Sequence, residues 1–200
     1  MSIQSMNGNI LTAVDVETSG VWAGYNEIIQ IAAVPLNHHF EPHPDMRPFY
    51  LNIKPDYFDR IEKEAVAKHR INPEDLKECP SQDRSVELFY EWFKGLKLPF
   101  GKRLVPLAHN FAFERGFLTY WQGVEGMQDV WQSHPRDTMT LAATINDLYV
   151  WHGRKQPFKY LNLVSLCKMF DIELDNAHDA LADCLATAKL YAALMRFMGG

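Results

Sequence analysis

Apolar residues in the first third of the chain gather in three segments and predict three strands in succession. Each segment is rich in β-branched or other apolar residues and stops at residues that favour turns, such as Pro35. Because the links between the segments are short, we expect an antiparallel meander. The predicted strands are residues 11–20, 26–35 and 49–53.

From residue 59 onward the apolar spacing becomes helical, with short apolar runs between the helical segments. Two of those runs, residues 103–108 and 130–131, are predicted as strands. This order predicts an α/β fold with a five-stranded mixed sheet, in which three antiparallel strands are followed by two parallel ones and helices flank the sheet. The predicted helices start near residue 61 and then cover residues 85–96, 110–123, 137–148, 161–170 and 180–198.

Residues that favour helix starts support these boundaries. We expect Asn110, Asp137 and Asp179 each to cap a helix, because Asn and Asp side chains accept hydrogen bonds from the first backbone amides of a helix. The last helix carries apolar residues at helical spacing that should dock on the sheet. These residues are Leu181, Leu185, Ala188, Ala192 and Met195.

Two carboxylates lie side by side on the first predicted strand. Successive strand residues point to opposite faces, so Asp15 and Glu17 share a face with Leu11 and Ala13. No Lys or Arg occurs among residues 1–46 to pair with them. If the strand is central, a divalent metal held by oxygen ligands would offset the several kcal/mol that burying a carboxylate costs. If the strand lies at an edge, both side chains face water. The pattern alone leaves both interpretations open.

Length and composition indicate one soluble domain. The chain has 200 residues, 47% of them hydrophobic, which is enough for one core, and we assign residues 1–9 to a tail and residues 10–198 to the domain. The polar start and the lack of a long apolar run predict a cytoplasmic protein without membrane contact. Three widely spaced cysteines argue against a disulfide framework. The net charge of −5 does not by itself indicate nucleic-acid binding.

Acidic and basic chemistry recurs at the starts of two later helices. Glu114 lies one turn into the helix that follows a buried strand, and Asp183 lies near the start of the last helix, where it can face the first strand. His178 is expected in the loop before that helix. A loop histidine can move, which suits a general base.

Three segments together resemble a known family. Residues 14–20 (VDVETSG), 109–114 (HNFAFE) and 178–183 (HDALAD) are similar to the three motifs of the DEDDh 3′→5′ exonucleases, which include the proofreading subunit of the bacterial replicative polymerase, oligoribonuclease and ribonuclease T. The resemblance extends over residues 10–198 and implies a ribonuclease H-like fold.

The resemblance also implies a site and a mechanism. Two divalent cations, Mg²⁺ or Mn²⁺, would be held with Asp15 bridging both, Glu17 and Asp183 each adding a ligand, and Glu114 at the remaining acidic position. His178 would take a proton from the attacking water. The chain departs from the family at Glu114, where the second motif normally has Asp, and the longer side chain should weaken rather than abolish metal binding.

The expected substrate is single-stranded DNA or RNA with a free 3′ end, with DNA slightly favoured, and the expected products are nucleoside 5′-monophosphates. Alternatives are an exoribonuclease of the same family and a non-catalytic ribonuclease H-like module that binds nucleic acid. Trp22 could stack on the terminal base or serve packing, and a homodimer or a polymerase partner is left open. The substrate-binding candidates are Thr18, Ser19, Trp22, Asn110 and, in a basic loop, Arg154, Lys155 and Lys159.

Overall fold

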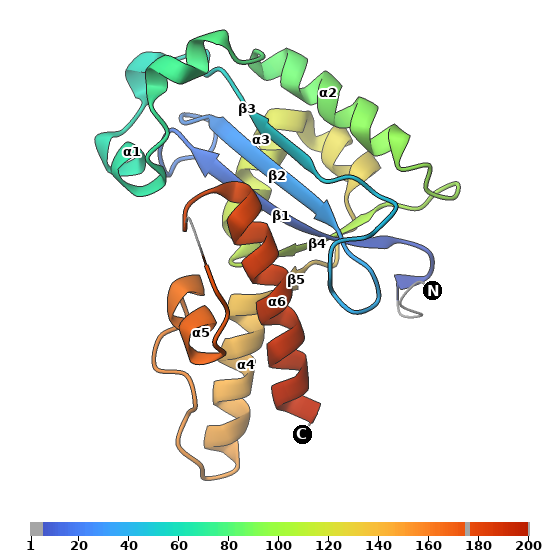
Figure 1. Cartoon of the computed structure of the whole chain (residues 1–200), viewed down its shortest axis with the longest axis vertical. Coiled ribbons are helices and arrows are strands. Elements are labelled where there is room, and N and C mark those ends of the chain that lie inside the picture. Colours follow the sequence, from blue (N-terminus) through green and yellow to red (C-terminus); the bar gives the residue numbers. More distant parts are fainter. Residues whose placement is uncertain (1–5, 175–176, 200) are drawn as a thin grey trace.

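The computed structural model describes residues 6–174 and 177–199 and contains a five-stranded mixed sheet with strand order β3-β2-β1-β4-β5 (Figure 1). The first three strands are antiparallel neighbours, and β4 and β5 run parallel to β1, which confirms the predicted sheet. The strands are β1 (Ile10–Thr18), β2 (Ile28–Pro35), β3 (Phe49–Asn52), β4 (Leu104–Ala108) and β5 (Arg136–Asp137).

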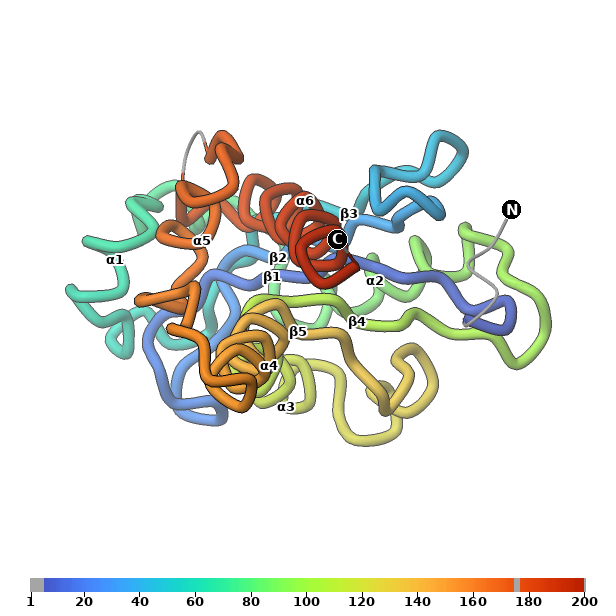
Figure 2. Tube along the Cα trace, turned by 90° about the horizontal axis from the view of Figure 1, so that it is seen from below, coloured from blue at the N-terminus to red at the C-terminus, as the bar shows by residue number. Residues whose placement is uncertain are grey.

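Helices cover both faces of this sheet. The helices α2 and α3 pack on one face and α6 packs on the other, while α4 and α5 lie against α6. Figure 2 shows α6 and α3 on opposite sides of β1 and β4. The helices are α1 (Lys63–His69), α2 (Gln82–Gly95), α3 (Phe111–Val130), α4 (Thr138–Trp151), α5 (Leu163–Met169) and α6 (Ala180–Gly199), with short 3-10 helices η2 (Phe58–Arg60) and η3 (Pro73–Glu78).

The strand β1 lies at the centre of the sheet and is paired on both sides. Val14 and Val16 belong to the core beneath α2 and α3, whereas Leu11 and Ala13 belong to the core beneath α6. Strand alternation therefore places Asp15 on the α6 side of the sheet. The edge-strand interpretation is wrong, because β1 has β2 on one side and β4 on the other.

The pairing partners of β1 differ in length. The ladder with β4 ends where Ala13 pairs with Leu107, whereas the ladder with β2 continues to Thr18. The last residues of β1, including Asp15 and Glu17, thus have no β4 neighbour. At this end of β1, residues of the helix that follows β4, α3, can therefore lie beside the strand.

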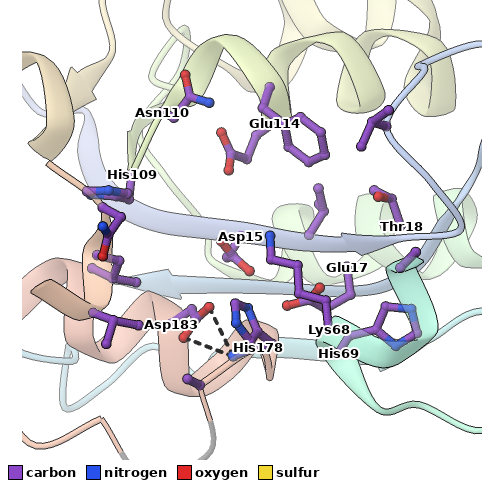
Figure 3. Close-up of a pocket in the computed structure, with 18 of the residues that line it drawn as sticks. Asp15, Glu17, Thr18, Lys68, His69, His109, Asn110, Glu114, His178 and Asp183 are labelled. Carbon is purple, nitrogen blue, oxygen red and sulfur yellow. Dashed lines mark hydrogen bonds between the residues drawn. The ribbon is translucent and has the colours of Figure 1, made fainter. Parts of the chain in front are cut away.

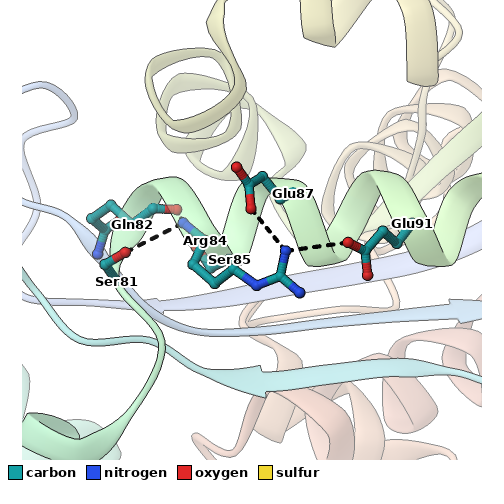
Figure 4. Close-up of polar contacts among 6 residues, drawn as sticks. All are labelled: Ser81, Gln82, Arg84, Ser85, Glu87 and Glu91. Atoms are coloured by element: carbon teal, nitrogen blue, oxygen red, sulfur yellow. Dashed lines mark hydrogen bonds and ion pairs between the residues drawn. The ribbon is translucent and has the colours of Figure 1, made fainter.

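The helix α2 shows how local sequence sets an element boundary. The Ser81 hydroxyl accepts a hydrogen bond from the Arg84 backbone amide at 3.3 Å and caps the helix. The Arg84 guanidinium lies 2.8 Å from the Glu87 carboxylate and 3.2 Å from that of Glu91 (Figure 4). Because these ion pairs are exposed, they contribute at most about 1 kcal/mol each. The buried Phe89 ring anchors α2 to the sheet instead.

The predicted strand at residues 130–131 is wrong. Val130 ends α3, and Trp131 forms only an isolated bridge with Leu104, while the fifth strand is β5. Helical backbone geometry is interrupted at Gly123, where φ is 75°, and the helix then resumes. Both apolar residues are buried at the end of this second helical stretch, and a short buried run has no period that distinguishes helix from strand.

Helix capping is only partly as predicted. Asn110 has a left-handed backbone with φ 81° and its side chain makes no capping hydrogen bond, so the predicted cap is wrong. Asp137 caps two helices instead, because its carboxylate accepts hydrogen bonds from the amides of Phe111 at the start of α3 and Thr140 in α4. One carboxylate therefore joins two elements that are separated in sequence.

The docked face of α6 consists mainly of small residues. Ala180, Cys184 and Ala188 are buried against the sheet, which lets the helix axis approach the strands closely. Leu181 is partly buried against the same core, but Met195 is 40% exposed and does not belong to the docked stripe. The prediction fails there because the end of the helix extends past the sheet (Figure 1).

The start of the described chain is packed rather than loose. Met6 is buried in the core beneath α6, and the Asn9 side chain accepts a hydrogen bond from the Arg103 amide at 2.8 Å. This shortens the predicted tail, whose residues 1–5 lie outside the described residues. None of the helices within residues 6–174 and 177–199 combines the length and hydropathy needed to cross a membrane.

Candidate active site

A cavity of about 650 Å³ lies at the open end of β1, with walls from β1, α1, α3, α5 and the start of α6 (Figure 3). It forms where β4 has ended and α3 begins. Most of the predicted site residues line this cavity, although they come from distant parts of the sequence. Those residues are Asp15, Glu17, Thr18, Asn110, Glu114, His178 and Asp183.

Four of the carboxylates that line the cavity are predicted site residues, and these four come from three elements. Asp15 and Glu17 project from β1, Glu114 from the first turn of α3, and Asp183 from the first turn of α6. Glu17, Glu114 and Asp183 are 7%, 4% and 8% exposed, respectively. Carboxylates this buried need protons or cations to offset the loss of water.

Burial is the main electrostatic effect on all four groups. It raises the pKa of Glu17 to about 8 and that of Asp183 to about 6, against the attraction of the Lys68 ammonium, which lowers both. Burial also raises the pKa of Asp15 and of Glu114 well above their usual values. For Asp15 the next cause is repulsion from the neighbouring carboxylates, first that of Glu114. The cavity therefore favours positive charge at neutral pH.

The donor set fits divalent metal ions. The Glu114 Oε2 atom is buried and has no hydrogen-bond partner among the described residues. Glu17, His178 and Asp183 each offer a ligand atom, and those atoms lie within 4.8 Å of one another. Carboxylate oxygens are the usual protein ligands of Mg²⁺ and Mn²⁺, and an imidazole nitrogen suits several transition metals. An unpartnered buried carboxylate oxygen is the kind of group that a bound cation satisfies.

His178 lies in the loop before α6, as predicted. Its backbone has φ 73°, and its amide donates to the Asp183 carboxylate at 3.3 and 3.4 Å (Figure 3). Burial lowers the pKa of the His178 imidazole, and the positive charges of Lys68 and Arg70 lower it further. The imidazole is therefore neutral at pH 7 and able to accept a proton.

A hydrogen-bond network fixes the start of α6 to the sheet. The Gln30 side chain accepts from the Ala180 amide at 2.9 Å and donates to the Tyr50 hydroxyl at 2.9 Å. The Tyr50 hydroxyl donates in turn to the Asp179 carboxylate at 2.6 Å. Asp179 caps α6, as predicted, by accepting from the amides of Leu181 and Ala182 at 3.1 and 3.0 Å. The network holds the segment that carries His178 and Asp183.

Among the cavity residues that were not assigned to the site from sequence, three are basic. Lys68 and His69 come from α1, and Figure 3 shows both beside the acidic cluster. Lys68 forms no ion pair within 4.0 Å among the described residues. His109, which precedes α3, has a buried Nε2 atom without a hydrogen-bond partner in the same part of the chain. The α1 segment is short and carries no chemical motif, so only its position in the fold reveals these residues.

Several predicted substrate-binding residues lie outside the cavity lining. Ser19 is fully buried and is not among the lining residues, and its hydroxyl accepts from the Glu27 amide at 2.9 Å, which ties the end of β1 to the start of β2. Trp22 is 70% exposed on the turn that follows β1. The basic residues Arg154, Lys155 and Lys159 are exposed in the loop between α4 and α5 and do not line the cavity.

Sequence comparison relates the chain to known nucleases. The family described as Exonuclease (RNase T) matches residues 12–191. Ribonuclease T from Shewanella denitrificans is 31% identical over 188 residues, which cover 89% of this chain and 76% of that protein. The PolC-type DNA polymerase III of Staphylococcus aureus is 28% identical over 184 residues, which cover 92% of this chain. The chain spans only about a tenth of the polymerase, since the match covers 11% of it.

Solved structures share the fold. Exonuclease I of E. coli in complex with a dT13 oligonucleotide aligns with a TM-score of 0.73 at 21% identity, covering 96% of this chain and 43% of that one. Exonuclease X in complex with 5′ overhanging duplex DNA aligns with a TM-score of 0.61 at 22% identity, covering 95% of this chain and 93% of that one. The sheet and its flanking helices are thus ribonuclease H-like, as expected.

Proposed function

The chain belongs to the exonuclease family and is a 3′→5′ exonuclease of the DEDD type, and on this premise we propose that it degrades single-stranded nucleic acid by a two-metal mechanism with His178 as general base. The products are nucleoside 5′-monophosphates. The observation that carries the proposal is that the four predicted carboxylates and His178, whose imidazole pKa is lowered, line a single cavity.

Asp15, Glu17, Glu114 and Asp183 would hold the two metals, Mg²⁺ or Mn²⁺. When bound, the metals neutralise the scissile phosphate and lower the pKa of the attacking water. The neutral His178 imidazole accepts a proton from that water. The Asp183 carboxylate, which accepts a hydrogen bond from the His178 amide, keeps the loop close to the reacting atoms.

The terminal nucleotide would lie between β1 and α3, in contact with Thr18 at the end of β1 and Asn110 just before α3, both of which line the cavity (Figure 3). Trp22 could stack on a base just outside it. We favour DNA over RNA as the substrate, and the dT13 bound to the structural neighbour Exonuclease I supports this choice. The second candidate is an exoribonuclease, which the relationship to ribonuclease T favours.

Degradation of matched end-labelled strands tests the proposal. Single-stranded DNA, duplex DNA and RNA of one sequence are incubated with Mg²⁺ or Mn²⁺, with a 5′ label to follow shortening from the 3′ end. We expect stepwise shortening, fastest on single-stranded DNA, and its loss on addition of EDTA and in Asp15→Asn. Glu125→Gln, at an exposed position of α3, is the matched control and should keep full activity. Activity that survives in Asp15→Asn would refute the assigned metal site.

Arg154, Lys155 and Lys159 are proposed to attract the phosphates of the strand farther from the site. Their exposure on one basic loop supports this role in a protein whose net charge is −5. Neutralising all three should raise KM and flatten the dependence of cleavage on salt concentration. If the salt dependence of cleavage does not change, the loop does not bind the phosphates of the substrate.

A further inference from the structure

Exposed aromatic rings surround an arginine beside the mouth of the cavity. Tyr25, on the turn between β1 and β2, is 55% exposed, and Tyr57, just before η2, is 46% exposed. The Arg60 guanidinium lies over both rings, 3.6 Å from the Tyr57 centroid and 4.9 Å from the Tyr25 centroid. We call Tyr25, Tyr57 and Arg60 the aromatic platform.

The Arg60 side chain is held in place but is not neutralised. One of its N–H groups donates to the Tyr25 carbonyl oxygen at 3.3 Å. Among the described residues no carboxylate lies within 4.0 Å of its guanidinium nitrogens. A guanidinium stacked on a ring keeps a flat face and free N–H groups, which are the features that recognise bases in nucleic acids.

Hydrogen bonds hold the backbone under the platform. The fully buried Asn26 side chain accepts from the Trp22 amide at 2.9 Å and donates to the Arg60 carbonyl oxygen at 3.1 Å. The Tyr57 amide donates to the Glu27 carboxylate at 3.0 Å. These bonds tie the β1–β2 turn to η2, so the two tyrosines present a preorganised surface.

The platform continues the wall of the active-site cavity. Gly20 and Val21 line the cavity, and the same turn carries Tyr25. Glu62, two residues after Arg60, also lines the cavity, and its amide donates to the Ser19 carbonyl oxygen at 2.8 Å. A strand whose 3′ end occupies the cavity can therefore leave it over the platform.

Neighbouring charges restrict what the platform can bind. Asp56 and Asp59 are exposed on the same segment as Tyr57 and Arg60. These negative charges disfavour a chain of phosphates at this position, whereas the rings and the guanidinium face favour uncharged, flat bases.

We propose that the aromatic platform is an upstream subsite that stacks bases of a single-stranded substrate, a few nucleotides before its 3′ end. The inference rests on the proposed exonuclease function and adds to it a binding site separate from the metal cluster. Stacking on aromatic rings tolerates any base, so the subsite lengthens the contact with the strand without imposing a sequence.

Substrate length separates the platform from the catalytic centre. Tyr57→Ala and Arg60→Gln should lower kcat/KM on a single strand of about ten nucleotides by about tenfold, the loss typical of one stacked base. The same variants should act on a dinucleotide, which ends before the platform, as the unmodified protein does. Tyr57→Phe keeps the ring and should therefore keep the kcat/KM of the unmodified protein on the longer substrate. Trp151→Ala, an 85% exposed aromatic at the end of α4, is the matched control.

Substrate binding measured without metal distinguishes the proposed platform from the proposed exonuclease function. In EDTA, fluorescence anisotropy compares a labelled strand with an abasic strand of equal length, and Arg60→Gln should weaken binding only to the strand that carries bases. Equal losses on the dinucleotide and the long strand, or equal weakening for the abasic strand, would overturn the platform. If the unmodified protein degrades neither substrate, the proposed function fails, whatever the binding data show.

Discussion

Single charged residues in the cavity shift the pKa values of their neighbours. Burial raises the pKa of each of the four carboxylates, while Lys68 lowers the pKa of each by attraction. The same ammonium, by repulsion, lowers the pKa of His178. Substitution of each of these side chains can therefore be tested for its effect on metal affinity as well as on kcat.

His178→Ala separates a general base from a metal ligand. If the imidazole only accepts the proton, kcat should fall by about 10²- to 10⁴-fold while the affinity for Mn²⁺ stays the same. The proximity of His178 to Glu17 and Asp183 allows the other outcome, in which calorimetry shows weaker Mn²⁺ binding. That outcome would contradict the base assignment. His134→Ala, at an exposed position, is the control.

Glu114→Ala tests the residue that departs from the family motif. Removing a carboxylate whose Oε2 has no protein partner should weaken metal binding and greatly reduce hydrolysis. Glu114→Asp shortens the side chain by one methylene and should keep substantial activity, since it restores the residue usual in this motif. Near-normal hydrolysis by Glu114→Ala would remove Glu114 from the ligand set.

Lys68→Met tests the cation that lies among the acids. Removing the positive charge should tighten Mn²⁺ binding by about tenfold, because a like charge no longer opposes the metal. Lys63→Met, on the exposed side of α1, should leave the affinity unchanged. Titration calorimetry without substrate measures both affinities, and an equal affinity for Lys68→Met and the unmodified protein would show that the ammonium does not face the metals.

At the scale of elements, the site depends on where two of them end or begin. The early end of β4 opens the side of β1, and the start of α6 supplies Asp183 and, just before it, His178. The start of α6 is fixed by hydrogen bonds that its backbone amides donate to Gln30 and Asp179, in addition to apolar packing. Weakening those bonds should therefore disturb the site even though none of the predicted catalytic residues is substituted.

Asp179→Ala removes the α6 cap and the acceptor of the Tyr50 hydroxyl. The free energy of unfolding should fall by about 1 kcal/mol, the typical cost of losing such a cap. Hydrolysis should fall as well, because the His178 loop loses its anchor. Urea unfolding measures the first effect and kcat the second. Asp179→Asn keeps an N-cap acceptor and should recover most of the stability, and equal destabilisation by both variants would argue against a capping role.

At the scale of the whole molecule, the acidic cavity makes stability depend on pH and metal. A carboxylate whose folded-state pKa is raised binds its proton more tightly when folded, so it stabilises the fold at low pH and loses that contribution as pH rises. For Glu17 the loss runs from its ordinary pKa near 4.5 up to about 8, and for Asp183 from 3.8 up to about 6.

The metal-free protein should therefore lose stability between pH 5 and pH 8. Differential scanning fluorimetry in EDTA should show a falling Tm across this range. Mn²⁺ at about 100 times its Kd should restore about 2.7 kcal/mol at pH 8. Glu17→Gln should flatten the profile and Glu125→Gln should not. A metal-free Tm that rises over the range would contradict the acidic cluster.

The sequence by itself determined the order of the elements, the mixed sheet and the three motifs, because strand and helix periods and short motifs are properties of neighbouring residues. It also indicated Asp15, Glu17, Glu114, His178 and Asp183, which the fold gathers in one cavity.

Only the tertiary structure decided that β1 is central, that Asp137 rather than Asn110 caps α3, and that Lys68 enters the acidic cluster. The aromatic platform likewise exists only because the β1–β2 turn and η2 meet in space. These features depend on contacts between residues far apart in the chain. Local patterns do not encode such contacts, because packing and the lengths of neighbouring strands set them.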